Sequence, residues 1–86
     1  DDPPVPLTPI RPKYPESAQE AGIEGTVVVQ VFVDARGRVK DTVILKGIPN
    51  TGLDEAATVA IRAVRFRPAR QRERAVGVWI SIPVNF

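Results

Sequence analysis

Apolar and polar residues alternate along residues 26–46, which read TVVVQVFVDARGRVKDTVILK. A period of two is typical of a β-strand with one buried face. In the first half the predicted buried face holds Val27, Val29, Val31 and Val33. In the second half it holds Val39, Val43 and Leu45. Ile44 is out of phase with this pattern. Asp34 and Gly37 lie between the two runs, at positions that favour a tight turn, so we expect an antiparallel hairpin.

The most regular alternation occurs in residues 76–86, where we expect the last strand. Its predicted buried face holds Val76, Val78, Ile80, Ile82, Val84 and Phe86. Pro83 lies on the other face and has no amide N–H, which predicts an edge strand with position 83 directed to the open side. Because backbone groups alternate in direction along a strand, Gly77, Trp79 and Ser81 should direct their N–H and C=O groups to the same open edge.

An open edge of good β-formers can bind an extended peptide as an added strand. The predicted peptide-binding residues of this edge are Gly77, Val78, Trp79, Ile80 and Ser81. Arg11 and Tyr14 are expected to flank or support the site. The alternative interpretation is that Trp79 packs on the proline-rich segment of the chain and that the edge binds nothing.

Two segments carry helix signals. Pro15 suits the first position of a short helix over Pro15–Ala21, and Gly22 suits its left-handed C-cap. A second helix should begin after Thr51, with Asp54 completing a capping pair, and Pro68 should end it at or just before Arg67. Its predicted buried face holds Leu53, Ala57, Ala60, Ile61 and Val64.

The first fifteen residues contain six prolines: Pro3, Pro4, Pro6, Pro9, Pro12 and Pro15. Proline fixes φ and favours an extended backbone in the preceding residue, so we expect a polyproline-like arm. We place a linker tail at residues 1–12 and the folded domain at residues 13–86. The sequence contains no apolar run that could span a membrane and no signal peptide. It begins at Asp1 rather than Met, so we expect a fragment of a longer protein.

The amino-acid composition argues against some classes of function. The chain has neither His nor Cys, and Asp34, Asp41 and Glu73 show no spacing that predicts a shared site, so we expect no enzyme, metal site or cofactor. The formal net charge is only +2. The arginines are nevertheless clustered, at Arg62, Arg65, Arg67, Arg70, Arg72 and Arg74. This basic patch could bind an anionic polymer, but we favour the simpler interpretation of a solvated helix end and loop.

Several motifs occur in an order that resembles the C-terminal domain of TonB-type energy transducers. They are RPKYP at residues 11–15, GIEGTV at 22–27, VD at 33–34, GRV at 37–39, LDEAA at 53–57 and RFRPA at 65–69. The resemblance covers about Arg11 to Phe86. It departs from well-known members at two positions. Arg11 replaces a glutamine that touches the partner peptide, and Val64 replaces a tryptophan that is common in relatives.

The resemblance implies an α+β fold, in which a three-stranded antiparallel sheet carries two helices on one face and a proline-rich extended arm precedes it. It implies a periplasmic domain, anchored to the inner membrane through an upstream segment and coupled there to ExbB and ExbD. The last strand would pair with the TonB box, an N-terminal peptide of outer-membrane transporters for cargo such as siderophores, and would pass on force derived from the proton gradient. No nucleic acid is implied.

Two alternatives remain open beside transport. A TonB-like domain could serve envelope sensing or scaffolding, and the basic patch could bind an anionic polymer with an affinity that falls steeply as salt increases. An exposed edge and a hairpin also permit a strand-exchanged homodimer.

Overall fold

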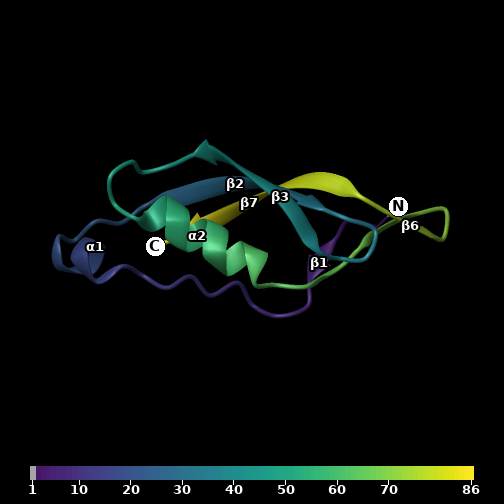
Figure 1. Cartoon of the computed structure of the whole chain (residues 1–86), viewed down its shortest axis with the longest axis horizontal. Helices are drawn as coiled ribbons and strands as arrows, with labels where there is room; N and C mark the ends of the chain where they lie inside the picture. The colour runs from purple at the N-terminus through teal and green to yellow at the C-terminus, as the bar shows by residue number, and fades with distance from the viewer. Residues whose placement is uncertain (1) are drawn as a thin grey trace.

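Three long strands form the main sheet in the computed structural model, which describes residues 2–86 (Figure 1). The central strand is β2 (Thr26–Val33), which pairs antiparallel with β3 (Val39–Lys46) on one side and with β7 (Val78–Asn85) on the other. One face of the sheet carries α2 (Leu53–Arg62), and α1 (Glu16–Glu20) lies at one end of the molecule. This is the α+β architecture that the resemblance implied.

The core lies between the sheet and α2. Strand β2 alternates strictly, and Val27, Val29, Val31 and Val33 have no exposed surface, which confirms the face predicted from the sequence. Leu53, Ala57 and Ile61 of α2 are equally buried and pack in the same apolar cluster. Burying a valine or leucine side chain contributes about 1.5–3 kcal/mol each, so these two elements supply most of the apolar stabilisation.

The face predicted for β3 is confirmed at Val39, which pairs with Val33 and packs against the core, and is wrong at Val43 and Leu45. β-Bulges interrupt its pairing with β2 between Val28 and Val29 and between Phe32 and Val33. Each bulge inserts an extra residue and reverses which side chains face the core. Val43 and Leu45 are therefore 45% and 53% exposed. Ile44 pairs with Val29 and borders a hollow beside α2, so it lies on the face of the sheet that carries the helix, although it is still 38% exposed.

The turn between β2 and β3 has the predicted geometry. Gly37 has φ 80°, and its N–H donates to the Asp34 carbonyl. One carboxylate oxygen of Asp34 accepts from the backbone N–H groups of Arg36 and Arg38, each at 2.9 Å. The pKa of Asp34 is lowered, chiefly by the Arg38 N–H. Burial is the second-largest effect and raises the pKa, whereas the Arg36 N–H and the charges of Lys40 and Arg38 lower it further.

Both helices are shorter than predicted. In α1, Gly22 has φ 68°, its N–H donates to Gln19, and the Ile23 N–H donates to Ala18. This is the Schellman C-cap that Gly22 predicts. Helix α2 ends at Arg62 with Ala63 as its C-cap, and Phe66 beyond it is buried in the core.

The N-terminus of α2 also differs in detail from the predicted capping pair. The Thr51 hydroxyl accepts from the Leu53 N–H at 3.2 Å, as a cap would, and donates to the Ile48 carbonyl. Asp54 instead accepts from the Ile48 N–H at 2.8 Å. The carboxylate therefore secures the preceding loop and does not complete a capping box.

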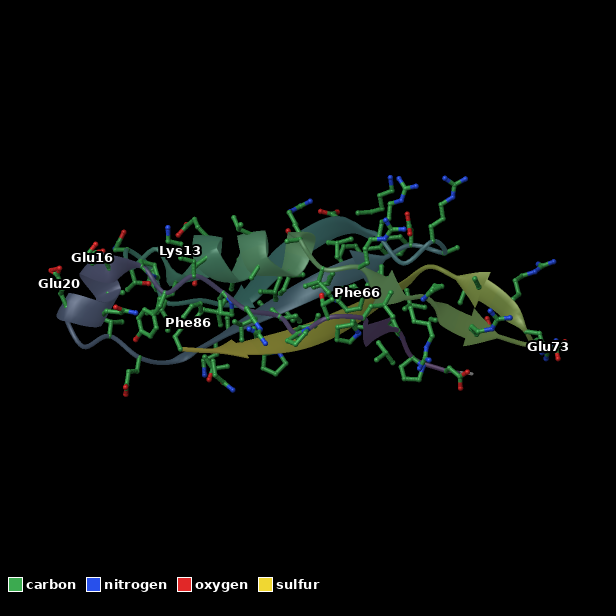
Figure 2. All side chains as sticks on the ribbon, turned by 90° about the horizontal axis from the view of Figure 1, so that it is seen from below. Lys13, Glu16, Glu20, Phe66, Glu73 and Phe86 are labelled. Carbon is green, nitrogen blue, oxygen red and sulfur yellow. The ribbon has the colours of Figure 1, made fainter. Side chains whose placement is uncertain are left out.

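Two small antiparallel pairs complete the fold. The arm forms β1 (Val5–Pro6), which pairs with β4 (Phe66–Arg67), and Asp2 bridges to Arg70. A second hairpin joins β5 (Ala69–Gln71) to β6 (Arg74–Val76) and protrudes beyond the sheet at the end where β7 begins (Figures 1 and 2). From β1 the arm returns along the molecule beside α2 to reach α1. The division into a tail at residues 1–12 and a domain at residues 13–86 stays a prediction.

Candidate functional site

Strand β7 has an edge with no paired neighbour among residues 2–86, because β2 is its only partner in the sheet. Just beyond the strand, Gly25 and Phe86 exchange both backbone hydrogen bonds, at 3.2 and 2.8 Å. Antiparallel pairs alternate between hydrogen-bonded and non-hydrogen-bonded positions. The unbroken register from Thr26–Asn85 to Val33–Val78 therefore makes the even-numbered residues of β7 bond to β2.

The outward backbone groups of β7 belong to its odd-numbered residues. These are the N–H groups of Trp79, Ser81 and Asn85 and the carbonyls of Trp79, Ser81, Pro83 and Asn85. Pro83 lacks only a donor that would have pointed to the open side, which explains why the strand tolerates it. Sequence reasoning missed Asn85, although the same alternation from Pro83 places it on this edge.

Trp79 lies beside this edge on the sheet face opposite the core. It is 46% exposed, and its ring lies 5.4 Å from the ring of Phe32 on β2, at an interplanar angle of 60°. The neighbouring Gly77 leaves room for Phe32, because a Cβ at Gly77 would lie 2.7 Å from the end of that ring. Trp79 therefore packs on the sheet itself and keeps an exposed face next to the edge.

Val78 and Ile80 were predicted to belong to the peptide-binding edge, but their backbone groups face the other way. Their backbone groups bond to β2, so they cannot bond to an added strand. Their side chains are half-buried and point to the core side of the sheet, where they line a groove with the arm and the β5–β6 hairpin. Of the predicted edge residues, Trp79 and Ser81 offer backbone groups inside β7, and Gly77 precedes the strand.

Tyr14 attaches the arm to the end of the sheet. Its hydroxyl donates to the Ile23 carbonyl, and its ring meets the Phe86 ring edge-on, with centroids 5.4 Å apart. These contacts fix the arm next to the end of β7. Tyr14 thus packs next to the end of the edge strand, and its role as a support for peptide binding stays a prediction.

Arg11 lies on another surface. It is exposed and lines a shallow groove of about 460 Å³ along the outer side of α2, together with Lys13 and Val59. The residues that line this groove include none from β7. The structure therefore does not bring Arg11 together with Trp79 and Ser81 in one pocket.

The six arginines of the basic patch are all exposed. They follow the chain from the end of α2 through β4 and into the β5–β6 hairpin. Arg62 donates to the Thr42 hydroxyl at 3.0 Å, and Arg70 donates to the Glu73 carbonyl at 2.7 Å. Only part of the patch, on the hairpin, adjoins the start of β7 in the chain.

Residues 2–86 contain no group of three or more His, Cys, Asp or Glu side chains positioned to hold a metal ion. Within the same residues, no helix has the length and apolar character needed to cross a membrane.

Comparison with known proteins extends this picture. The family model for the C-terminal part of the Gram-negative bacterial TonB protein matches residues 10–86. Protein tonB2 of Pseudomonas aeruginosa is 36% identical over 75 residues, which cover 87% of this chain and 28% of that protein. Protein TonB of Vibrio cholerae is 33% identical over 86 residues, which cover 100% of this chain and 35% of that protein. The chain thus spans about a third of the length of these curated relatives.

A solved structure shows the same fold. The solution NMR structure of the Pseudomonas aeruginosa TonB CTD superposes with a TM-score of 0.79 at 30% sequence identity, and the match covers 100% of this chain and 87% of that one. Fold and sequence thus give the same answer over nearly all of the chain. The chain belongs to the family of TonB C-terminal domains.

Proposed function

We propose that this domain binds an extended peptide as a fourth strand on the open edge of β7, and that the peptide is the N-terminal TonB box of an outer-membrane transporter. The observation that carries the proposal is the unpaired edge, with the outward N–H and C=O groups of Trp79 and Ser81 and the outward carbonyl of Pro83. Membership of the TonB family supports the choice of partner.

The edge has the capacity for a moderate affinity. Up to seven outward groups from Trp79 to Asn85 could pair, each contributing about 0.5–1.5 kcal/mol net. Ordering of a flexible peptide opposes this gain. The balance corresponds to a dissociation constant nearer micromolar than nanomolar, which suits a partner that must be released.

The proposed role of the complex is mechanical. In the whole protein, a segment outside this chain would anchor the domain in the inner membrane and couple it to ExbB and ExbD, which use the proton gradient. The domain would work in the periplasm, and force would pass through the added strand to the transporter. Pulling along a strand loads its hydrogen bonds together, so a short ladder can transmit force that the same bonds would not withstand one at a time.

An NMR titration of the labelled domain with peptides from transporter N-termini tests the proposal, at low and high salt. We expect shifts concentrated at Trp79, Ser81 and Asn85 that persist at high salt, since backbone pairing depends little on ionic strength. A matched control uses the same peptide with backbone N-methyl groups on alternate residues, in both phases. One phase should abolish binding, because its methyl groups face β7, and the other should retain it.

Two results would refute the proposal. Equal binding of both N-methylated peptides would show that no ladder forms. Shifts confined to the arginines between Arg62 and Arg74 that vanish with salt would instead indicate an anionic polymer as the partner.

A further inference from the structure

The arm and β4 form a small two-stranded ribbon with one exposed face. Val5 pairs with Arg67, and just beyond β1 the Leu7 N–H donates to the Arg65 carbonyl at 2.9 Å. Residues paired across an antiparallel ladder share a face, and successive residues alternate between faces. The outward surface, which we call the ribbon face, therefore holds Val5, Leu7, Arg65 and Arg67. Phe66 points the other way and is buried in the core.

The ribbon face exposes aliphatic side chains beside its arginines. Leu7 is 62% exposed and Val5 is 38% exposed. Single exposed aliphatic side chains are common on protein surfaces and need no explanation alone. Leu7 differs because it lies opposite Arg65, and Val5 lies opposite Arg67. The ribbon face therefore combines apolar and cationic groups side by side.

The β2–β3 turn brings two more arginines to this end of the molecule. The Phe66 N–H donates to the Gly37 carbonyl at 2.8 Å, so the turn lies along the edge of β4 that β1 leaves free. Arg36 and Arg38 flank Gly37, and both are exposed. They are distant from β4 in the sequence, so the basic patch predicted from the sequence did not include them.

Positive charge is concentrated at one end of the molecule, whose longest dimension is 48 Å. Figure 2 shows nitrogen-tipped side chains gathered around Phe66 and the β5–β6 hairpin, whereas Glu16 and Glu20 lie at the opposite end. Residues 34–38 and 65–74 carry seven arginines and two acidic residues, Asp34 and Glu73. The formal net charge of +2 therefore conceals a strongly basic end.

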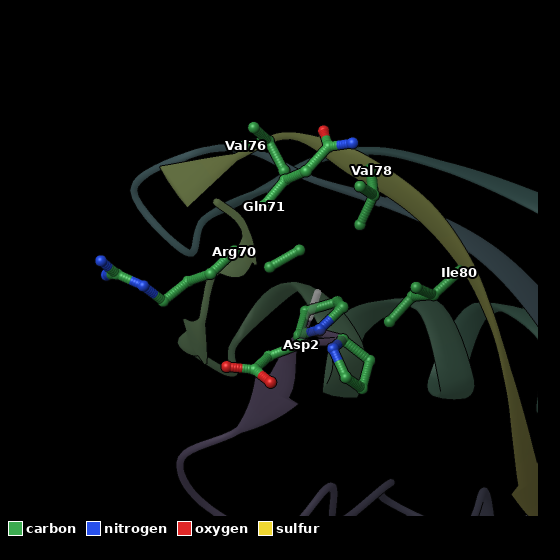
Figure 3. Close-up of a pocket in the computed structure, with 9 residues that line it drawn as sticks. Asp2, Arg70, Gln71, Val76, Val78 and Ile80 are labelled. Carbon is green, nitrogen blue, oxygen red and sulfur yellow. The ribbon is translucent and has the colours of Figure 1, made fainter. Parts of the chain in front are cut away.

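The arginines at this end keep their charge available for a partner. Within residues 2–86, the arginine side chains that hydrogen-bond are Arg62 and Arg70, and their acceptors are a hydroxyl and a backbone carbonyl. Figure 3 shows the Arg70 guanidinium directed away from the groove beside Val78 and Ile80. A guanidinium can bind two oxygens of one phosphate group, so these arginines suit a partner that carries phosphates.

A lipid surface fits the ribbon face better than a soluble polyanion does. A polyanion would contact the arginines but gain nothing from an exposed leucine. At a membrane surface, basic residues bind anionic headgroups while aliphatic side chains enter the boundary between headgroups and acyl chains. We propose that the ribbon face docks the domain on an anionic phospholipid surface, with Leu7 inserted between headgroups whose phosphates bind Arg65 and Arg67.

The inference goes beyond strand addition at β7 and does not depend on it. The proposed place of action, the periplasm, is bounded by membranes, so lipid headgroups are within reach of the domain. Docking through the ribbon face would hold the basic end of the molecule at the lipid surface. The acidic end at α1 would then point away from that surface.

Flotation with lipid vesicles tests the proposal on the 86-residue chain. One vesicle contains equal parts of phosphatidylglycerol and phosphatidylcholine, and the other contains phosphatidylcholine alone. We expect binding to the first vesicle only, and we expect it to weaken strongly as salt increases. In NMR spectra, a spin-labelled lipid should broaden the amide signals of Leu7, Arg65 and Arg67 and leave those of Glu16 and Glu20 sharp.

Charge variants test the contribution of the arginines. Arg65→Gln with Arg67→Gln should weaken binding to the anionic vesicle about 25-fold at low salt, because each arginine near such a surface contributes about fivefold. Lys13→Gln with Lys46→Gln is the matched control, since it removes the same charge near α1 and at the end of β3. The control should weaken binding no more than about twofold.

Aliphatic variants test the inserted side chain. Leu7→Ser should weaken vesicle binding about tenfold, because it removes the apolar group that enters the lipid. Leu45→Ser makes the same change at a position of β3 that is 53% exposed, and its binding should match the wild type. Both positions are exposed, so both variants should keep the fold, which urea denaturation checks.

Three results would overturn the inference. The first is binding to neither vesicle. The second is vesicle binding that Leu7→Ser and the Arg65–Arg67 double variant leave unchanged. The third is binding to heparin but to no vesicle, which would assign the arginines to a polyanion. Each result concerns the ribbon face alone, and the peptide titration tests strand addition at β7 separately.

Discussion

Ser81 provides the sharpest test of the edge, because proline at this position should block the partner while sparing the fold. The Ser81 N–H points away from β2, since Ser81 and Gln30 form a non-hydrogen-bonded pair. Pro83, two residues later, already shows that the strand accepts proline on this side. The preceding residue, Ile80, has the extended conformation that proline requires of its predecessor. We therefore expect Ser81→Pro to lower the free energy of unfolding by no more than about 1 kcal/mol.

The effect on peptide binding should be larger. The variant loses one hydrogen bond, worth about 0.5–1.5 kcal/mol net, and leaves a peptide carbonyl without a donor, at about 1–3 kcal/mol. Together these losses of about 1.5–4.5 kcal/mol correspond to a dissociation constant that is roughly 10- to 2,000-fold larger. Ser81→Ala keeps the N–H and removes only an exposed hydroxyl, so its affinity should match that of the wild type within about twofold.

Isothermal titration calorimetry with a transporter peptide measures the affinities, and urea denaturation measures the stabilities. Ile82→Pro serves as a contrast, because its N–H bonds to Val29 across the sheet. That substitution should destabilise the domain by about 3 kcal/mol or more. The reasoning about strand direction would be refuted if folded Ser81→Pro bound the peptide as tightly as Ser81→Ala.

Three further predictions concern stability. Tyr14→Phe should lower the free energy of unfolding by about 1 kcal/mol in urea denaturation, because it removes the hydrogen bond to Ile23 but keeps the ring; an unchanged midpoint would contradict the anchoring role. The pKa of the Asp34 carboxyl is lower in the folded chain than its unfolded value of 3.8. The ionised carboxylate therefore stabilises the fold fully above pH 3.8, and the free energy of unfolding should fall as the pH drops through the folded pKa. Asp34→Asn should remove this part of the pH dependence of stability. Gly37→Ala should lower the free energy of unfolding by about 3 kcal/mol or more on thermal or chemical denaturation, since its Cβ would lie 1.9 Å from a backbone oxygen of β4. A Cβ at Gly22 would meet no atom within 4 Å, so Gly22→Ala should cost only about 1 kcal/mol. Equal losses in the two variants would refute the steric argument.

Elements with a strict local pattern were predictable from the sequence. The four buried valines of β2 and the edge position of β7 follow from alternation and from Pro83, which depend on nothing outside the strand. The phase of β3 was not predictable, because its two bulges arise from pairing with β2. Helix α2 was predicted too long, since Pro68 sets only an outer limit and the helix ends five residues before Arg67, at Arg62.

The candidate site also has features that local sequence patterns predict and features that they do not. The outward direction of Trp79 and Ser81 follows from one proline and the period of a strand. The position of Arg11 beside α2 and the groove at Val78 depend on how the arm returns along the molecule, which no local pattern encodes. The β5–β6 hairpin was missed because its turn residues, Arg72 and Glu73, are not typical of a tight hairpin turn.

The arm of the domain also has a consequence for reach. Near its start the arm is attached by short contacts, the bridge between Asp2 and Arg70 and the two-residue pair of β1 with β4. Tension applied at Asp2 would separate these contacts one after another, while the long ladder between β2 and β7 stays intact. Residues 2–13, drawn straight, span about 40 Å at roughly 3.3–3.6 Å per residue. The arm could therefore peel away from the domain before tension reaches Tyr14 and the core, and the freed segment would span up to that distance.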